Sequence, residues 1–165
     1  MATPRAASSS ASRPGAAVRT ATIGVGHFGR YHAQKYAATN AAHLVAVCDV
    51  DQARAEQVAA ELGTRAVSDY RTLLGAVDAV SVVVPTRAHH EIAQAFLEAG
   101  VHVLVEKPIA STLDEADDLI RIARKRNVVL QVGHLERFSS VRQAMDAVVR
   151  RPLYIEANRI SPFRQ

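Results

Sequence analysis

Short apolar segments alternate with amphipathic helical segments along most of this chain, and this alternation restricts the folds open to it. The apolar segments predict strands at residues 21–25, 44–48, 66–67, 79–84, 101–105 and 128–132. The segments between them predict helices at residues 27–38, 51–62, 89–99, 112–125 and 139–150, with a helical turn at 70–74. Strands that are apolar throughout lie in parallel sheets covered on both faces. We therefore expect an α/β fold with a doubly wound parallel sheet, Rossmann-like in its right-handed crossovers.

The composition excludes several classes of protein. Of the 165 residues, 48% are hydrophobic and 22% are charged, which is ordinary for one globular domain. No apolar run approaches the roughly 18–20 residues that a membrane helix needs, so we expect no membrane partner. The single cysteine, Cys48, rules out an internal disulfide and fits a reducing compartment, so we expect a cytoplasmic protein.

The net charge of +4 comes mainly from the N-terminal part of the chain, because no acidic residue precedes Asp49. The basic residues are not interleaved with aromatic ones and form no nucleic-acid motif, so we expect no nucleic-acid partner. Residues 1–18 are mainly Ala, Ser, Pro and Arg, which predicts a disordered tail. A transit peptide is the alternative interpretation of this basic, acid-free start.

A glycine-rich turn at residues 24–29 follows the first strand and begins the first helix. In such a turn Gly24 permits the tight bend, Gly26 lets the backbone approach a pyrophosphate, and Gly29 lets the helix pack on the strand. The helix N-terminus adds unpaired N–H groups and a partial positive charge. Methyltransferases share this pattern, but its position between a strand and a helix favours a dinucleotide site. The predicted cofactor-binding residues of the turn are Gly24, Gly26, His27, Phe28 and Gly29.

Asp49 ends the second predicted strand, twenty residues after Gly29. At this spacing a carboxylate binds the adenosine ribose hydroxyls and repels a 2′-phosphate. We therefore expect NAD as the cofactor, with NADP disfavoured. Arg54 could soften this preference, although we expect it to face solvent from its helix. The alternative is that Asp49 only caps the helix that follows it.

Polar residues follow three further strands, at the carboxyl edge where ligands bind in such sheets. These candidates for the site are Pro85, Thr86, His89, Glu106, Lys107, His134 and Arg137. A lysine beside nicotinamide can take or relay the proton of a substrate hydroxyl as a hydride leaves its carbon. To act as a base at neutral pH it needs burial or a neighbouring cation. The alternative is that Lys107 is a surface residue after a strand.

We predict no metal site in this chain. His89 and His90 are adjacent, so on a helix they do not face one centre, and no cysteine or carboxylate spacing supports zinc. The alternative to any ligand-binding role is that both histidines lie at the start of a helix and bind nothing.

With these motifs together, the chain resembles the N-terminal domain of the glucose–fructose oxidoreductase, inositol dehydrogenase and MocA-like (Gfo/Idh/MocA) oxidoreductases over residues 21–165. The resemblance rests on the glycine turn, Val84-Pro85-Thr86 with His89, Glu106-Lys107-Pro108, and residues 133–138. The glycines are shared by many families, whereas the Glu-Lys-Pro motif is specific.

The resemblance implies an NAD(P)-dependent dehydrogenase of a sugar, polyol or nucleotide sugar. Lys107 matches the family's catalytic lysine, which contacts substrate and cofactor, and Pro108 matches a proline that is often cis. In the same family, His134 and Arg137 fall at the substrate or nicotinamide pocket. Residues 131–138 are similar to members that oxidise the 3-hydroxyl of UDP-N-acetylglucosamine.

Members of this family continue with an α/β domain whose open sheet forms the substrate wall and often a dimer interface, and which supplies an aspartate-and-histidine motif. We therefore expect a disordered tail over 1–18, a dinucleotide-binding domain over 19–150, and the first strand of a truncated substrate domain over 151–165. Such a chain should bind the cofactor better than it catalyses. An exposed strand at its end, or the missing domain, could also form a homo-oligomer.

A different class of function remains open from the sequence. The chain could be a non-enzymatic NAD-binding module that senses redox state. A methyltransferase is a third possibility, and the Glu-Lys-Pro motif argues against it.

Overall fold

A computed structural model of the protein describes residues 16–151 and positions 153, 154, 156 and 158, without the side chain of residue 147. The described chain divides into two units. One unit ends at Gly133 and the other begins at His134, and each is described by itself.

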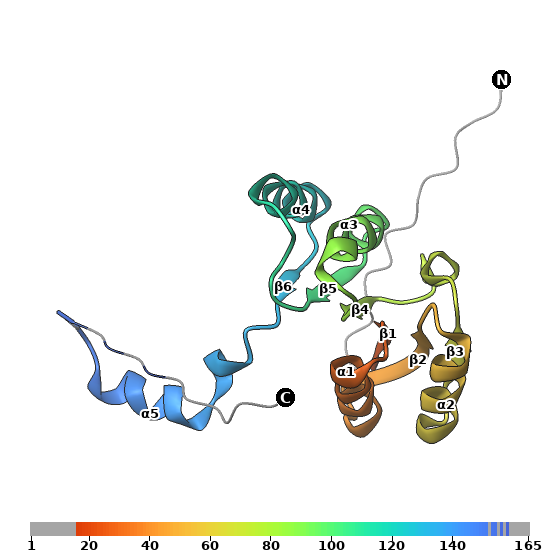
Figure 1. The fold of residues 1–165 in the computed structure, drawn as a ribbon, viewed down its shortest axis with the longest axis horizontal. Coiled ribbons are helices and arrows are strands. Elements are labelled where there is room, and N and C mark those ends of the chain that lie inside the picture. Colours follow the sequence, from red (N-terminus) through yellow and green to blue (C-terminus); the bar gives the residue numbers. More distant parts are fainter. Residues whose placement is uncertain (1–15, 152, 155, 157, 159–165) are drawn as a thin grey trace, which may run out of the picture. The chain divides into compact units, whose positions relative to one another are not determined.

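The first unit is built on a six-stranded sheet in the order β3-β2-β1-β4-β5-β6, and all of its neighbouring strands are parallel (Figure 1). The strands are β1 (Val18–Ile23), β2 (Ala42–Cys48), β3 (Arg65–Val67), β4 (Ala79–Val82), β5 (His102–Val105) and β6 (Leu130–Val132). The chain winds outward from β1 in one direction, then returns past it to β4 and continues in the other. This confirms the predicted doubly wound parallel sheet.

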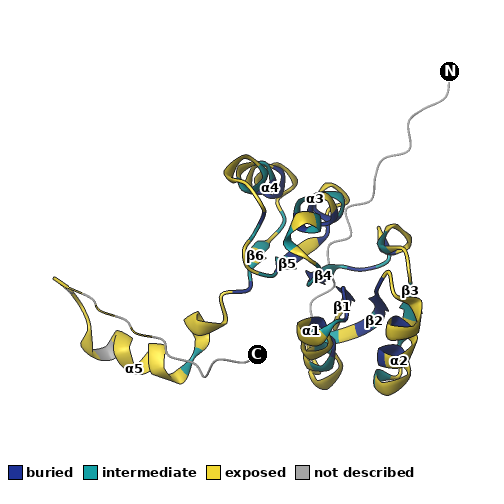
Figure 2. Cartoon of the chain, viewed as in Figure 1, coloured by how far each residue is buried: buried dark blue, intermediate teal, exposed yellow. Residues whose placement is uncertain are grey.

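Helices cover both faces of this sheet (Figure 1). The helices α1 (His27–Ala38) and α2 (Gln52–Leu62) lie on one face, and α3 (His89–Glu98) and α4 (Leu113–Arg126) lie on the other. The 3₁₀ turns η1 (Tyr70–Leu73) and η2 (Thr86–Ala88) flank β4. Buried residues face the sheet and exposed ones face outward, as amphipathic helices require (Figure 2). The largest fully buried side chains are Phe96, Leu73, Leu97 and Leu119.

Local signals in the sequence fix the helix ends. Asp51 begins α2 by accepting the backbone N–H of Arg54 at 3.1 Å, and Gly63 ends it in the left-handed region. Thr112 and Glu115 form a capping box at the start of α4. These ends confirm the predicted helices.

All six strands differ from their predicted limits by one to three residues, and two of the differences have a clear cause. β1 begins at Val18, three residues early, because Val18 donates to the carbonyl of Ala41 at 2.9 Å and so joins β2. The regular part of β4 ends at Val82, two residues early, because the chain then turns towards Pro85, which has no N–H to donate. The limits of these strands depend on tertiary contacts, which a run of apolar residues in the sequence does not predict.

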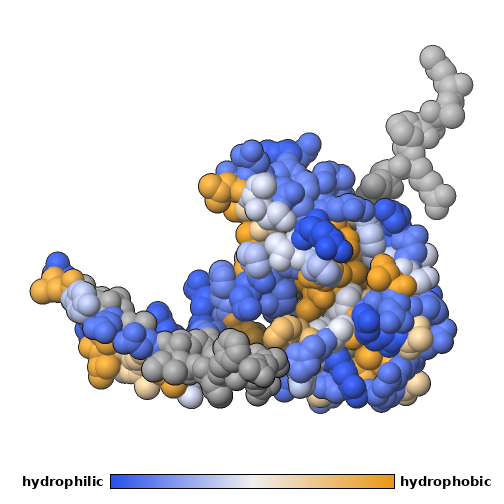
Figure 3. Space-filling view, viewed as in Figure 1, coloured by the Kyte–Doolittle hydropathy of each residue, from blue (hydrophilic) through white to orange (hydrophobic). Residues whose placement is uncertain are grey.

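The second unit contains η3 (Leu135–Phe138) and α5 (Ser140–Val148). Ser139 caps α5 by accepting the N–H of Arg142 at 3.2 Å. Apolar side chains, including Val141, Met145 and Val148, are exposed on this helix (Figure 3). The strand predicted within residues 151–165 lies largely outside the described residues, as do residues 1–15 of the predicted tail. Among the described helices, none is both long and apolar enough to span a bilayer.

Candidate cofactor and active site

The glycine turn joins β1 to α1 through two positions that exclude any side chain. Gly24 has a φ of +83°, and a Cβ there would overlap the carbonyl oxygen of Val83 beside β4. A Cβ on Gly29 would overlap the carbonyl oxygen of Gly24 itself. Only glycine therefore allows α1 to start this close to the end of β1.

Gly26 differs from its two neighbours in the motif, because a Cβ there would meet nothing within 4 Å. It lines pockets on both sides of the turn, and it caps α1 without a side-chain hydrogen bond. The missing side chain therefore leaves space for a ligand and does not serve packing within the protein. The N-terminus of a helix carries unpaired N–H groups, so the start of α1 beside this space suits an anion such as a pyrophosphate.

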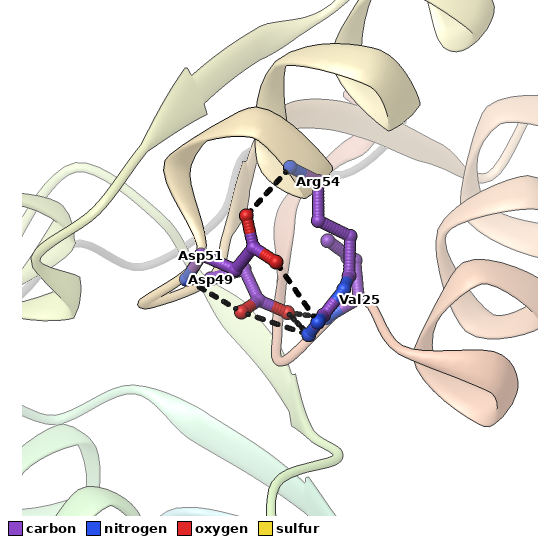
Figure 4. A network of polar contacts seen from close by, with 4 residues as sticks. All are labelled: Val25, Asp49, Asp51 and Arg54. Carbon is purple, nitrogen blue, oxygen red and sulfur yellow. Dashed lines mark hydrogen bonds and ion pairs between the residues drawn. The ribbon is translucent and has the colours of Figure 1, made fainter.

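Asp49 lies at the end of β2, and only 6% of its surface is exposed. One carboxylate oxygen accepts the backbone N–H of Val25 in the glycine turn, and the other accepts the N–H of Asp51, both at 2.9 Å (Figure 4). Because Asp51 caps α2, the alternative that Asp49 caps this helix is wrong. Asp49 instead holds its carboxylate beside the glycine turn, and its contact with a ribose stays a prediction.

The expectation that Arg54 is exposed on its helix is confirmed, but the side chain also pairs with two carboxylates. Its Nη1 lies 3.2 Å from Oδ2 of Asp49, and its Nη2 lies 3.0 Å from Oδ2 of Asp51 (Figure 4). The side chain is 47% exposed, but its guanidinium turns back towards the two carboxylates. The spacing of three residues between Asp51 and Arg54 on a helix was the available signal.

A pocket of about 470 Å³ opens at the carboxyl edge of the sheet. It brings together four of the predicted residues, namely Gly24, Gly26, Asp49 and Pro85. It also takes in Arg54, and residues that the sequence did not single out for a site, among them Ser68, Tyr70 and Arg87. Cys48 lines it too, and burial, with smaller contributions from Asp49 and Asp69, raises the pKa of its thiol to about 12.

Two predicted residues at the start of α1 lie on its outer side. His27 lines a separate pocket of about 370 Å³ with residues of α1 and α2. Phe28 is 62% exposed and packs edge-on against the His27 ring, with the ring centroids 5.1 Å apart. Their side chains contact each other, and a contact of either with the cofactor stays a prediction.

His89 is 1% exposed, and both of its ring nitrogens have backbone partners. Nδ1 lies 2.8 Å from the carbonyl oxygen of Pro108, and Nε2 lies 2.9 Å from that of Val84. The ring thus joins the segment after β4 to the loop after β5. Thr86, also predicted, begins the short η2 that leads to His89.

The Glu106-Lys107-Pro108 motif follows β5, and its last peptide bond is cis. The carboxylate of Glu106 accepts the N–H of Lys107 at 3.1 Å and lies 3.3 Å from Nε2 of His32 in α1. Lys107 itself is exposed, so residues 16–133 do not supply the burial that a base would need.

His134 and Arg137 belong to the second unit, where both are exposed at the start and within η3. The N–H of Arg137 donates to the carbonyl of His134 at 3.1 Å. Their proximity to the pocket of the first unit remains a prediction.

This geometry agrees with the comparison to known families. Residues 18–134 match the sequence model of an oxidoreductase family with an NAD-binding Rossmann fold. The chain belongs to the Gfo/Idh/MocA family. The match confirms the resemblance drawn from the motifs, and it identifies NAD as the cofactor of this domain.

Curated members of the Gfo/Idh/MocA family are longer than this chain. A UDP-N-acetylglucosamine 3-dehydrogenase from Acidithiobacillus ferrooxidans is 46% identical over 148 residues, which are 89% of this chain and 47% of that protein. The scyllo-inositol 2-dehydrogenase (NAD(+)) of Bacillus subtilis is 35% identical, over 83% of this chain and 43% of that protein. The chain therefore spans less than half the length of these relatives.

Solved structures of Gfo/Idh/MocA dehydrogenases share the fold. The Acidithiobacillus ferrooxidans enzyme superimposes with a TM-score of 0.76 at 47% identity, covering 79% of this chain and 41% of that one. A scyllo-inositol dehydrogenase from Lactobacillus casei, with bound NAD(H) and scyllo-inositol, gives 0.75 at 28% identity, covering 80% and 41%.

Proposed function

We propose that this chain is the cofactor-binding part of a dehydrogenase that acts on a hydroxyl of a sugar, polyol or nucleotide sugar. The observation that supports this most is the position of Lys107. It follows β5 at the carboxyl edge of the sheet, the same edge that carries the glycine turn and Asp49. A cofactor site and a proton-accepting amine at one edge are the two parts that alcohol oxidation requires.

In this proposal, different residues along this edge of the sheet bind the cofactor and transfer the proton. The turn at Gly24, Gly26 and Gly29 receives the pyrophosphate at the start of α1, and Asp49 accepts the ribose hydroxyls. Bound nicotinamide supplies the carbon that takes or gives the hydride. Lys107 takes the proton of the substrate hydroxyl as its carbon is oxidised, and returns it in the opposite direction.

The remaining predicted residues take places around this centre. Pro85, Thr86, His89 and Glu106 border the nicotinamide half of the site, through side chain or backbone. His134 and Arg137, from the second unit, contribute to the substrate side. Residues 19–150 form the dinucleotide-binding domain in this proposal, and 151–165 begin a substrate domain. The coverage of under half of the relatives supports that division.

A nucleotide sugar is the substrate class that we favour. The support is the 46% identity to a UDP-N-acetylglucosamine 3-dehydrogenase, together with the similarity of residues 131–138. The inositol dehydrogenases among the relatives keep the polyol class as the second candidate.

Calorimetric titration of the 165-residue chain with NAD and NADP tests the cofactor half of the proposal. We expect binding of NAD and weaker binding of NADP. NADH formation is then followed with UDP-N-acetylglucosamine and with myo-inositol, in the wild type and in Lys107→Met. Turnover that Lys107→Met abolishes, with affinity for ADP-ribose, which lacks nicotinamide, unchanged within about twofold, supports the proposal. Binding of NAD without turnover on either substrate keeps the redox-sensing module as an alternative, because a chain without the substrate domain is expected to bind the cofactor better than it catalyses. Absence of NAD binding overturns both.

We also propose a cytoplasmic location and a homo-oligomer. The lone, buried Cys48 and the NAD-dependent chemistry support the first. The exposed apolar residues of α5 support the second. Sedimentation velocity at two protein concentrations tests the oligomer, and a single monomeric species at both would exclude it.

A further inference from the structure

Four polar side chains form a continuous chain between α1 and the sheet. The Tyr36 hydroxyl lies 2.7 Å from Oγ of Ser81, and Nδ1 of His32 lies 3.1 Å from the same Oγ. Nε2 of His32 then lies 3.3 Å from Oε1 of Glu106. Ser81, in the middle of β4, is fully buried. The sequence showed only a helix with aromatic residues at these spacings.

The donors and acceptors of this chain fit a single direction. An ionised carboxylate only accepts, so the proton between His32 and Glu106 sits on Nε2 of His32. In the neutral tautomer with its proton on Nε2, Nδ1 of His32 accepts from the hydroxyl of Ser81, and Ser81 accepts from Tyr36. Each donor group then donates once. The line of donors runs from Tyr36 through Ser81 and His32 to the acceptor Glu106.

Glu106 is also held from two other sides. Its Oε2 accepts the backbone N–H of Lys107 at 3.1 Å. On the side of β6, a Cβ at Gly133 would lie only 2.5 Å from Oε1. The Glu106 side chain is therefore confined, at 14% exposure, by α1, by the end of β6 and by its own successor.

We propose that His32 is a positioning residue for Lys107 and that His32 acts through Glu106. The imidazole fixes the Glu106 carboxylate, and this carboxylate fixes the backbone at the point where Lys107 leaves β5. The amine of Lys107 is thereby presented at the edge where nicotinamide binds, so this inference rests on the proposed function. Side chains 74 residues apart in sequence, on α1 and after β5, then act as one unit.

Three variants and a control test this proposal. His32→Leu removes the hydrogen bond of the ring to Ser81 and its ion-pair contact with Glu106, whereas His32→Gln keeps a side-chain N–H donor. Gly133→Ala displaces the Glu106 carboxylate from the opposite side, at a position with no positive φ. His90→Leu is the matched control, because His90 also pairs with a carboxylate, that of Asp118 at 3.0 Å, but between α3 and α4.

The first readout is affinity for NAD and for ADP-ribose, which lacks nicotinamide. We expect His32→Leu and Gly133→Ala to weaken NAD about five- to tenfold more than ADP-ribose, as the loss of one good hydrogen bond would. His32→Gln should stay within about twofold of the wild type, and His90→Leu should leave the ratio unchanged. A role of His32 only in packing α1 would weaken both ligands equally, because α1 also carries the pyrophosphate site, and that result overturns the proposal.

The second readout needs no ligand. The Lys107 amide resonance in a ¹H–¹⁵N spectrum reports its hydrogen bond to Glu106, and we expect it to shift upfield in His32→Leu and in Gly133→Ala. An unshifted resonance in both would refute the positioning role. If the wild type bound neither ligand, the proposed function would fail, while this resonance would still decide the positioning of Lys107. If His32→Leu did not fold, Gly133→Ala would carry both readouts.

Discussion

The carboxylate of Asp49 accepts the backbone N–H of Val25 at 2.9 Å, so the end of β2 is tied to the glycine turn after β1. In Asp49→Asn the amide oxygen can still accept this N–H, but the negative charge is lost. We expect NAD affinity to fall about tenfold, because hydrogen bonds to a charged acceptor contribute about 1.5–3 kcal/mol. NADP should lose its electrostatic penalty, so the preference for NAD should shrink.

Titration of both cofactors measures this preference directly. Asp78→Asn is the control, since the carboxylate of Asp78 likewise accepts a backbone N–H, that of Arg19 at 2.9 Å, and pairs with an arginine. An unchanged ratio of the two affinities in Asp49→Asn would remove the ribose role from Asp49.

Arg54 provides a second, independent prediction about the same discrimination. Its guanidinium pairs with Asp49 and Asp51 and lies where a 2′-phosphate would approach. We expect Arg54→Met to weaken NADP several-fold more than NAD, because the phosphate loses a cation while the ribose hydroxyls keep Asp49. Arg30→Met, a similarly exposed arginine that pairs with Glu61, should change neither affinity selectively. Equal weakening of the two cofactors in Arg54→Met contradicts this assignment.

The glycines of the turn should separate binding from stability. Gly29→Ala places a methyl group against the carbonyl of Gly24, so we expect a loss of several kcal/mol or failure to fold. Gly26→Ala meets no protein atom within 4 Å, so its unfolding free energy should change by no more than about 1 kcal/mol. NAD affinity in Gly26→Ala should nevertheless fall more than tenfold, since the methyl group enters the ligand's space. Urea unfolding and calorimetry of the two variants measure both effects, and a Gly26→Ala protein with normal NAD affinity would contradict the site.

The buried ring of His89 should matter for stability. His89→Phe keeps much of the volume but leaves the carbonyls of Val84 and Pro108 without their ring partners. We expect a loss of about 1–3 kcal/mol in the free energy of unfolding, the cost of unsatisfied buried acceptors. His43→Phe, at an exposed position, should cost less than about 0.5 kcal/mol. Equal urea midpoints for the two variants would show that the contacts of the His89 ring with the two carbonyls contribute little to the free energy of unfolding.

Cys48 gives the pH dependence that the structure implies. Burial raises the pKa of its thiol from about 9 to about 12, so the folded state keeps the proton that the unfolded state releases in between. Stability from this group is complete below pH 9 and is lost as the pH rises from about 9 to about 12. Cys48→Ala should therefore lose less stability than the wild type over this range. The urea midpoints at pH 8 and pH 10.5 measure this difference, and parallel losses in both proteins would exclude Cys48 as the cause.

Much of the fold was accessible from the sequence because its signals are local. The end of α2 at Gly63 and the capping box at Thr112 lie within one turn of the helices that they define. The link from the glycine turn to Asp49 is also a fixed spacing along one βαβ unit. Such patterns predict the geometry of one or two elements, because residues that are neighbours in the sequence determine that geometry.

The contacts that the sequence did not reveal join distant elements. No spacing predicts that His32 reaches Glu106, because the register of α1 over β4 and β5 decides it. The direction of Arg54 depended likewise on where the carboxylate of Asp49 ended up. For His89, a cofactor contact was expected from its place at the edge, whereas its ring lies between two backbone carbonyls.

β1 is the first strand of the chain but lies inside the sheet, paired with β2 on one side and with β4 on the other. Without it, the pair β3-β2 and the trio β4-β5-β6 share no strand, and two paired strands alone are marginal in water. During synthesis this strand must wait until Ala79 to Val82 exist before its second edge is filled. Gly24 lies against Val83, just beyond that contact, so the glycine turn is built from both halves of the sheet. We therefore expect affinity for NAD to report whether the two halves have joined.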